Sequence, residues 1–353
     1  MNRREARERV LGCLLGGAIG DALGAPLEFM SLQEIRHRWG QRGALTYAPL
    51  NGRTGVITDD TQMTLWTIEG LLRARSSEQQ GRDTDTVAVI HRAYLRWLHT
   101  QGVPWTSARG PHIEDPGPTG WLVTNRRLFD EQAPGNTCLS ALRSGLVGSP
   151  AEPINDSKGC GGAMRVAPVG LVAEHPFELA MAVAAITHGH PSGYLAAAAF
   201  ARVVADLLSG RSLPEAINAA HEELTLRTGH QETSAAMSSA VDLERSSSGT
   251  AEDVERLGGG WVAEEALAIA IYCALRATDF RSGVILAANH SGDSDSTASM
   301  TGNLLGAKLG LGGLPPDLVE GLEARDLIME IGEDFVECFV RGVSPDPQRY
   351  PPD

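Results

Sequence analysis

Aromatic residues are scarce in this chain. Phe, Trp and Tyr together make up 5% of its 353 residues, whereas glycine occurs 40 times. A core built around large rings is therefore excluded, and small and aliphatic side chains must fill the interior by packing closely. With 42% hydrophobic residues, the chain is long and apolar enough to bury such a core.

Cysteines are few and scattered. None of the five belongs to a Cys-x-x-Cys pair; they are Cys13, Cys138, Cys160, Cys273 and Cys338. An odd number of separated thiols in a long chain argues against a disulfide framework and against a zinc site. We therefore expect reduced thiols and a cytoplasmic location.

Positive charge is also in short supply, because 30 Lys and Arg face 44 Asp and Glu, for a net charge of −14. Such a surface repels nucleic acid and anionic membranes, so neither is an expected partner. A phosphate-bearing substrate would need local cations or backbone N–H groups. The apolar stretch after Val10 is interrupted by Asp21, and it predicts neither a membrane span nor a signal peptide.

Strand-like alternation is nearly absent, and helical periodicity dominates instead. It predicts helices at residues 4–24, 61–74, 84–99, 138–147, 164–173, 177–187, 192–209, 213–223, 262–277, 280–288, 296–310 and 316–341. Three polar stretches are predicted as loops: 40–57, 103–137 and 226–259, the last of them partly mobile. Because no stretch separates two self-contained cores, we predict an all-α fold with a single compact domain over residues 1–353.

Two of the predicted helices carry small residues at every fourth position. These are Gly12, Gly16, Gly20 and Gly24 in the first, and Ala298, Gly302, Gly306 and Gly310 in the second. Residues four apart share one helix face, so a neighbouring backbone can approach closely there. Each helical glycine costs about 1 kcal/mol relative to alanine, which close packing must offset. We predict that this packing brings the two ends of the chain together around a shared site.

Acidic residues cluster at two places, each just before a predicted helix. The first is Thr58-Asp59-Asp60-Thr61, and the second is Asp293-Ser294-Asp295-Ser296-Thr297. A helix N-terminus favours a negative side chain by about 0.3–1 kcal/mol, so either cluster alone is explained as a cap. Four carboxylates on an apolar background exceed that need, and crowded carboxylates resist ionisation unless a cation joins them. Ligands that are all oxygen indicate Mg²⁺, Mn²⁺ or Ca²⁺ rather than Zn²⁺.

The ordered set of motifs resembles the ADP-ribosylglycohydrolase family. That family includes ADP-ribosylarginine hydrolases and the bacterial glycohydrolase that reactivates dinitrogenase reductase. The resemblance spans roughly residues 9–310 and is carried by GGAIGDALG at 16–24 with Glu28, by Thr58 to Thr61, by GGAMR at 161–165, by Thr187-His188 and by GDSDS at 292–296. It implies an all-α single domain with a dinuclear metal centre that holds two Mg²⁺ ions or, alternatively, Mn²⁺.

By this resemblance, the metal ligands come from both acidic clusters: Thr58, Asp59, Asp60, Asp293, Asp295 and Ser296. The resemblance also places substrate-binding residues at Asp21, Ser157, Gly159, Gly161, Gly162, Met164 and His188. Glu28 would lie over the substrate ribose, and either Glu28 or Asp295 would manage the proton. From the residues alone, Asp21 also fits a helix-end charge, Glu28 a solvated loop acid and the glycine-rich loop an ordinary turn.

Four other residues are assigned more modest roles. The glycine-rich loop at 157–165 is predicted to lead into a helix, so its backbone N–H groups would suit a diphosphate. Cys160 in that loop is interpreted as a small filler and not as a nucleophile, since no motif pairs it with a base. Simple packing is favoured over adenine stacking for Trp105, Trp121 and Trp261.

The resemblance implies hydrolysis of the N-glycosidic bond between ADP-ribose and an acceptor, most readily arginine. The expected partners are an ADP-ribosylated protein or small molecule and, as functional counterpart, a mono-ADP-ribosyltransferase. The acceptor stays open to serine, another side chain, a nucleic-acid base or a free small molecule, as another ADP-ribose conjugate. Two other functions also stay open: phosphoester or nucleotide-diphosphate hydrolysis at the same metals, and a non-catalytic, crystallin-like structural role. Release of phosphate or AMP would indicate the first, and metal-free folding without turnover the second.

Overall fold

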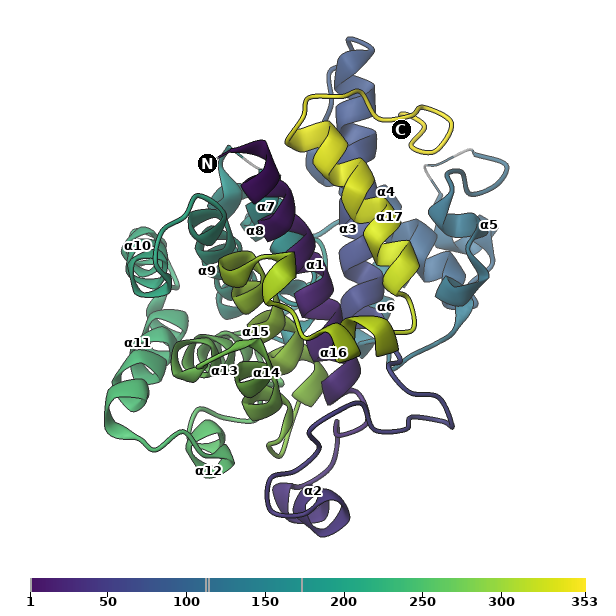
Figure 1. Ribbon diagram of the computed structural model, residues 1–353. Coiled ribbons are helices and arrows are strands. Elements are labelled where there is room, and N and C mark those ends of the chain that lie inside the picture. Colours follow the sequence, from purple (N-terminus) through teal and green to yellow (C-terminus); the bar gives the residue numbers. More distant parts are fainter. Residues whose placement is uncertain (1, 112, 114, 173) are drawn as a thin grey trace.

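The computed structural model describes residues 2–111, 113, 115–172 and 174–353. Its regular structure is helical, and in the described part of the chain only two isolated bridges, Leu50 with Arg53 and Gly159 with Val262, have strand-like pairing (Figure 1). The α-helices are α1 (Arg3–Gly24), α2 (Leu32–Trp39), α3 (Asp59–Gln79), α4 (Thr86–Thr100), α5 (Trp105–Ala108), α6 (Asn136–Arg143), α7 (Ala167–Val172), α8 (Pro176–Ala185), α9 (Pro191–Leu208), α10 (Leu213–Thr225), α11 (Gln231–Ser246), α12 (Ala251–Glu255), α13 (Ala263–Arg276), α14 (Phe280–Ala288), α15 (Ser294–Leu309), α16 (Pro316–Gly321) and α17 (Arg325–Phe339). The predicted all-α class is confirmed.

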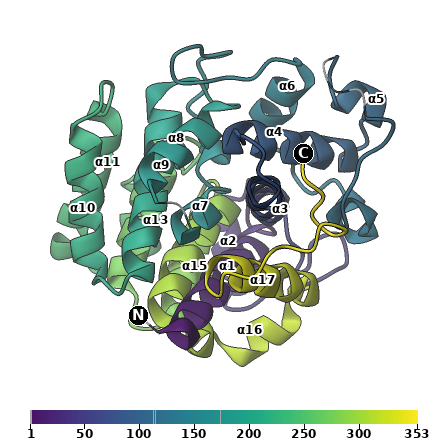
Figure 2. The ribbon, with the colours of Figure 1, turned by 90° about the horizontal axis from the view of Figure 1, so that it is seen from above.

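Helices α1 and α15 lie side by side at the centre of the molecule (Figures 1 and 2). A Cβ atom placed on Gly20 would lie 1.9 Å from the carbonyl oxygen of Ala298, and one on Gly306 would lie 1.9 Å from that of Gly12. The two backbones are therefore in direct contact along both small-residue faces. The prediction that these glycines join the two ends of the chain is confirmed.

The other helices flank this central pair. Helices α8, α9, α10, α11 and α13 lie on one side, and α3, α4, α5 and α6 lie on the other (Figure 2). Helix α17 packs on both α1 and α3. Within the described part of the chain, no helix is both long and apolar enough to cross a membrane.

The predicted loop at 226–259 is wrong. It contains α11 and α12, and α11 buries Thr233, Met237, Ala240 and Leu243 at helical spacing. Serines on the outer side of α11 hide this narrow apolar face in the sequence, because serine is typical of loops. Tertiary packing on α13 and α10 overrides that weak propensity.

Other boundaries also differ from prediction. The helix predicted at 316–341 is two helices, α16 and α17, separated at residues 322–324, and the helix predicted from 164 begins at Ala167. Helix α2 was not predicted, although a Ser31–Glu34 capping box starts it. The stretch 103–137 is mostly irregular and holds α5 and the 3₁₀ turns η1 (Leu122–Thr124) and η2 (Arg126–Phe129). Ala173 of one predicted helix, and His112 and Glu114 of this predicted loop, lie outside the described residues.

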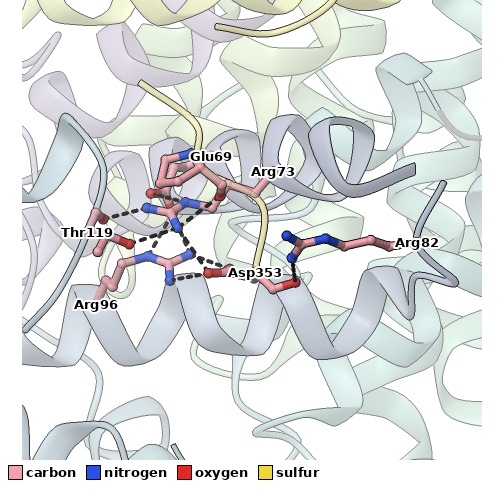
Figure 3. A network of polar contacts seen from close by, with 7 residues as sticks. Glu69, Arg73, Arg82, Arg96, Thr119 and Asp353 are labelled. Carbon is pink, nitrogen blue, oxygen red and sulfur yellow. Dashed lines mark hydrogen bonds and ion pairs between the residues drawn. The ribbon is translucent and has the colours of Figure 1, made fainter. Parts of the chain in front are cut away.

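A buried ion cluster ties the last residues of the chain to α3 and α4 (Figure 3). Glu69 accepts hydrogen bonds from Arg73 Nε at 2.7 Å and from Arg96 Nε at 3.1 Å. The Asp353 carboxylate accepts from both arginines, at 3.0 Å from each. Two cations and two anions balance each other here, and they hold the middle of α3 against α4 and the last residues of the chain.

Candidate active site

The first acidic cluster forms the start of α3. The Thr58 hydroxyl caps the helix by accepting from the Asp60 N–H at 3.3 Å, and Asp59 and Asp60 occupy the first turn. Unpaired N–H groups and the helix dipole favour negative side chains at these positions. Both carboxylates are buried, at 4% and 2% exposure, which is deeper than a capping residue requires.

Asp21 on α1 fixes the first turn of α3 by hydrogen bonds. Its carboxylate accepts from the N–H and hydroxyl of Thr58, at 3.0 and 2.9 Å, and from those of Thr61, at 3.1 and 2.5 Å. Burial and the nearby Asp295 nevertheless raise the pKa of Asp21 to about 7. Asp21 thus organises the start of α3 and is not among the residues that line the cavity described below.

The second acidic cluster forms the start of α15. Asp293 caps that helix by accepting from the Ser296 N–H at 3.3 Å, and Asp295 lies in its first turn. The Ser296 hydroxyl donates to Asp60 at 3.3 Å. Two clusters more than two hundred residues apart therefore meet in the fold, because the α1–α15 contact places the start of α15 beside the start of α3.

The carboxylates of both clusters are electrostatically uncompensated. Burial raises the pKa of Asp59, Asp60 and Asp293 well above the usual range, and it also raises the pKa of Asp295. None of them pairs with Lys or Arg in the part of the chain that the structure describes, and Asp60 Oδ1 is buried without a hydrogen-bond partner there. Buried carboxylates in this state fit a divalent cation, which would replace the missing positive charge.

The donor atoms are not arranged as a finished coordination sphere. Among the described residues, no group of three or more Asp, Glu, His or Cys side chains is placed to hold a metal ion. The fit to a hard cation therefore comes from the oxygen donors, their burial and the unpartnered oxygen of Asp60.

A cavity of about 280 Å³ opens over the two clusters. Its walls come from seven segments that are distant in sequence. The lining residues are Glu28, Phe29, Asp59, Asp60, residues 133–138, Gly159, Cys160, Gly161, Met164, His188, Trp261, Asp293, Asp295 and Ser296. Most of the predicted site residues therefore lie together, whereas Asp21, Thr58, Ser157 and Gly162 are not among the residues that line the cavity.

The glycine-rich loop forms one wall. Residues Cys160–Gly162 make a 3₁₀ turn, so the loop does not lead directly into α7 as predicted. A Cβ atom on Gly161 would lie 3.0 Å from Cys138 Sγ and 3.2 Å from His188 Cε1, so a larger residue there would require these side chains to shift by a few tenths of an ångström. Burial and the nearby Arg165 lower the pKa of His188 to about 3, so its imidazole is neutral. The loop and a neutral ring together offer hydrogen-bonding groups without adding charge.

Glu28 also lines the cavity, next to Phe29. Its carboxyl has no hydrogen-bond partner among the described residues. Burial first, and then the charges of Asp295, Asp293, Asp59 and Asp21, raise its pKa to about 10. Without a cation below it, Glu28 is therefore protonated at neutral pH, as suits a group that exchanges a proton with a substrate.

Several cavity residues could not be recognised from the sequence. The Cys160 thiol, interpreted as a filler, donates to Asp293 at 2.8 Å and lies 3.6 Å from Ser296 Oγ. Burial and Asp293 raise its pKa well above the usual range, which agrees with its not being a nucleophile. The Gly135 N–H donates to Asp59 at 3.0 Å from within a stretch predicted only as loop. Its one signal was the pair Pro134-Gly135, which is typical of any turn.

Comparison with known proteins agrees with this geometry. A family model described as ADP-ribosylglycohydrolase matches residues 2–343. The ADP-ribosyl-[dinitrogen reductase] glycohydrolase of Rhodospirillum rubrum is 28% identical, with 92% of this chain and 94% of that protein covered. The ADP-ribosylarginine hydrolase Tri1 of Pseudomonas putida is 26% identical over 94% of this chain and 79% of its own length. A solved structure of an ADP-ribosylglycohydrolase-related protein complex superposes with a TM-score of 0.68 at 25% identity, covering 95% of this chain and 99% of that one.

Proposed function

Because this chain belongs to the ADP-ribosylglycohydrolase family, we propose that it cleaves the N-glycosidic bond of ADP-ribosylated acceptors, arginine foremost, with two Mg²⁺ ions. The observation that carries this proposal is the meeting of two buried acidic clusters, joined by the Ser296–Asp60 hydrogen bond, beneath the Glu28 carboxyl. Release of ADP-ribose in this way would reverse mono-ADP-ribosylation.

The metal ligands would be Asp59, Asp60, Asp293 and Asp295, with the hydroxyls of Thr58 and Ser296. When bound, Mg²⁺ or its alternative Mn²⁺ supplies positive charge that orients ribose hydroxyls and a water molecule beside the scissile bond. Asp21 would keep the Thr58 end of this set in place, because four hydrogen bonds already fix it there.

The chain's own residues would carry the remaining steps. Glu28 or Asp295 would exchange the proton, and the surrounding carboxylates would stabilise positive charge on the sugar in an oxocarbenium-like transition state. The N–H groups of the loop at Gly159 and Gly161 would receive the diphosphate, which the acidic surface otherwise repels. Neutral His188 would lie against the substrate beside that loop.

The acceptor assignment rests on similarity to a protein named as an ADP-ribosylarginine hydrolase. The partners would be an ADP-ribosylated protein or small molecule, with a mono-ADP-ribosyltransferase as the opposing enzyme in the same cytoplasm. Diphosphate hydrolysis is the second candidate, because the same acidic cavity beside a glycine-rich loop suits that chemistry.

The test incubates the protein, with Mg²⁺ or with a chelator, against acceptors ADP-ribosylated on arginine, serine or a nucleobase, and identifies the released nucleotide by mass. We expect intact ADP-ribose from the arginine conjugate only when Mg²⁺ is present. Release of AMP or phosphate would instead support the diphosphate reading. Absence of both turnover and metal binding would support the non-catalytic structural role.

Two variants locate the chemistry. Asp59→Ala and Asp295→Ala should each abolish Mg²⁺ binding, measured by calorimetry, and turnover, while circular dichroism stays helical. The exposed Asp242→Ala is the matched control and should keep both. Full activity in both cavity variants would refute the metal assignment.

A further inference from the structure

Two large aromatic side chains stack at the mouth of the cavity. The rings of Phe29 and Trp261 are nearly parallel, with centroids 5.2 Å apart and an interplanar angle of 21°. Both side chains line the cavity, yet Phe29 is 75% exposed and Trp261 43% exposed. The chain has few aromatic residues, so two exposed rings in contact at the cavity mouth indicate a function at that position.

Trp261 stands on a firmly held segment. The N–H groups of Gly259 and Gly260 donate to Glu265, at 2.9 and 3.2 Å. The carbonyl of Gly259 accepts from the Asp293 N–H at 2.8 Å, and that of Trp261 accepts from the Cys160 N–H at 3.2 Å. The tryptophan is therefore anchored to the second acidic cluster and to the glycine-rich loop at once.

Phe29 stands on the segment that carries Glu28. Its φ of +67° lies in the left-handed region, which side chains other than Gly, Asn and Asp seldom adopt. Such a conformation persists only where surrounding contacts maintain it. The stack on Trp261 is the contact that Phe29 makes across the cavity mouth, whereas the neighbouring Glu28 carboxyl has no hydrogen-bond partner among the described residues.

We propose that the Phe29–Trp261 stack positions Glu28 over the acidic clusters. Through it, the cavity wall at residues 25–31, which carries Glu28, is joined across the mouth to the wall at 258–262. Phe29 and Trp261 are thus positioning residues for the proton-exchanging carboxyl. This inference rests on the proposed function, since it uses the role assigned there to Glu28.

The kinetic test compares Phe29→Ala and Trp261→Ala with the ring-preserving Trp261→Phe, on ADP-ribosylarginine with Mg²⁺. An aromatic pair contributes enough that losing it should lower kcat roughly three- to tenfold. The Kd for free ADP-ribose should not change, and Trp261→Phe should restore kcat. A weakened Kd with unchanged kcat would overturn the proposal, because the rings would then be binding nucleotide.

Phe29→Gly separates the ring from the backbone. Glycine tolerates the positive φ but cannot stack, so its kcat should fall as far as that of Phe29→Ala. Full kcat in Phe29→Gly would mean that backbone conformation alone sets the position of Glu28, and the proposal would fail. Leu226→Ala, which removes another exposed apolar side chain away from the cavity, is the control.

A measurement without turnover keeps this test apart from that of the proposed function. Three backbone hydrogen bonds, donated by the N–H groups of Leu27, Glu28 and Met30, report on the segment carrying Glu28. Their amide hydrogen exchange should accelerate in Trp261→Ala and stay as in the unaltered protein in Trp261→Phe. Unaltered protein that releases no ADP-ribose would defeat the proposed function, whereas unchanged exchange in Trp261→Ala would defeat the stack alone.

Discussion

A carboxyl group that is surrounded by other carboxyl groups keeps its proton unless a cation is near. Glu28 illustrates this, because burial and four aspartates raise its pKa to about 10. Asp21 is in the same electrostatic environment, yet four hydrogen bonds limit its pKa to about 7. This difference in hydrogen-bond partners supports the structural role proposed for Asp21 and the proton-exchanging role proposed for Glu28.

Replacing Glu28 with glutamine tests the proton-exchanging role. The amide keeps the size of the side chain but cannot transfer a proton, so kcat should fall about 10²–10⁴-fold. Mg²⁺ affinity and KM should change little, because Glu28 is not among the proposed ligands. Steady-state kinetics and calorimetry measure these quantities. If kcat stays within twofold, Asp295 is the better candidate.

At the scale of elements, the site depends on how closely two helices approach. Gly24 on α1 faces the backbone of Ser294, the first residue of α15, and a Cβ atom there would lie 2.2 Å from the Ser294 carbonyl oxygen. This contact sets the start of α15, and with it Asp293 and Asp295, against the end of α1. A helix-packing motif thereby determines the distance between the two acidic clusters.

Gly20→Ala should push α1 and α15 apart. The new Cβ would meet the Ala298 carbonyl oxygen at 1.9 Å, and a backbone cannot move aside as a side chain can. Overpacking of this kind costs about 1–3 kcal/mol or more, measured by urea unfolding. Gly312→Ala, where nothing lies within 4 Å of the new Cβ, should be nearly neutral. Equal stability of the two variants would show that the helices separate easily.

At the scale of the whole molecule, charge is held inside the protein in two different ways. The cluster of Glu69, Arg73, Arg96 and Asp353 is balanced within the chain (Figure 3). The acidic clusters at the starts of α3 and α15 have no such balance among the described residues. The first arrangement is complete within the chain, whereas the second would be completed by the divalent cations proposed above.

Glu69→Gln tests the balanced cluster. It leaves two buried arginines with one anion between them, and breaking a buried pair in this way costs about 3–5 kcal/mol of unfolding free energy. Glu78→Gln breaks the exposed Arg75–Glu78 pair on the same helix and should cost at most about 1 kcal/mol. Denaturant unfolding of both variants gives the comparison. Similar losses would mean that the cluster adds little to stability.

The uncompensated clusters predict a pH dependence. In unfolded protein, Asp and Glu lose their protons near pH 4, whereas folded Glu28 retains its proton to about pH 10 and Asp21 to about pH 7. Between about pH 7 and pH 9, the folded state therefore binds more protons, and raising the pH favours unfolding. Buried His188 and His290, with lowered pKa values, have the opposite effect below about pH 6.5.

Scanning calorimetry checks this expectation. In chelator, the unfolding midpoint should fall from about pH 7 to about pH 9. With Mg²⁺ the decline should be smaller, because the ion takes the place of the protons. A midpoint that rises with pH in chelator would contradict the raised pKa values of these acids.

The sequence by itself determined the helical class, the close contact of α1 with α15 and the identity of the acidic clusters. Each follows from local spacing: apolar residues at helical period, glycines four apart, and acids at helix starts. Helix α11 was not predicted because its buried face, around Met237 and Leu243, is narrow, and the residues on its other faces are typical of loops.

Only the tertiary structure decided which residues surround the clusters. Three contacts join residues that are far apart in the sequence: Cys160 with Asp293, Gly135 with Asp59, and Phe29 with Trp261. No periodic pattern in the sequence predicts them. The same is true of Asp353 joining Glu69 and its arginines. The physical reason is that spacing encodes which face of an element is buried, whereas the partner of that face depends on how the elements pack.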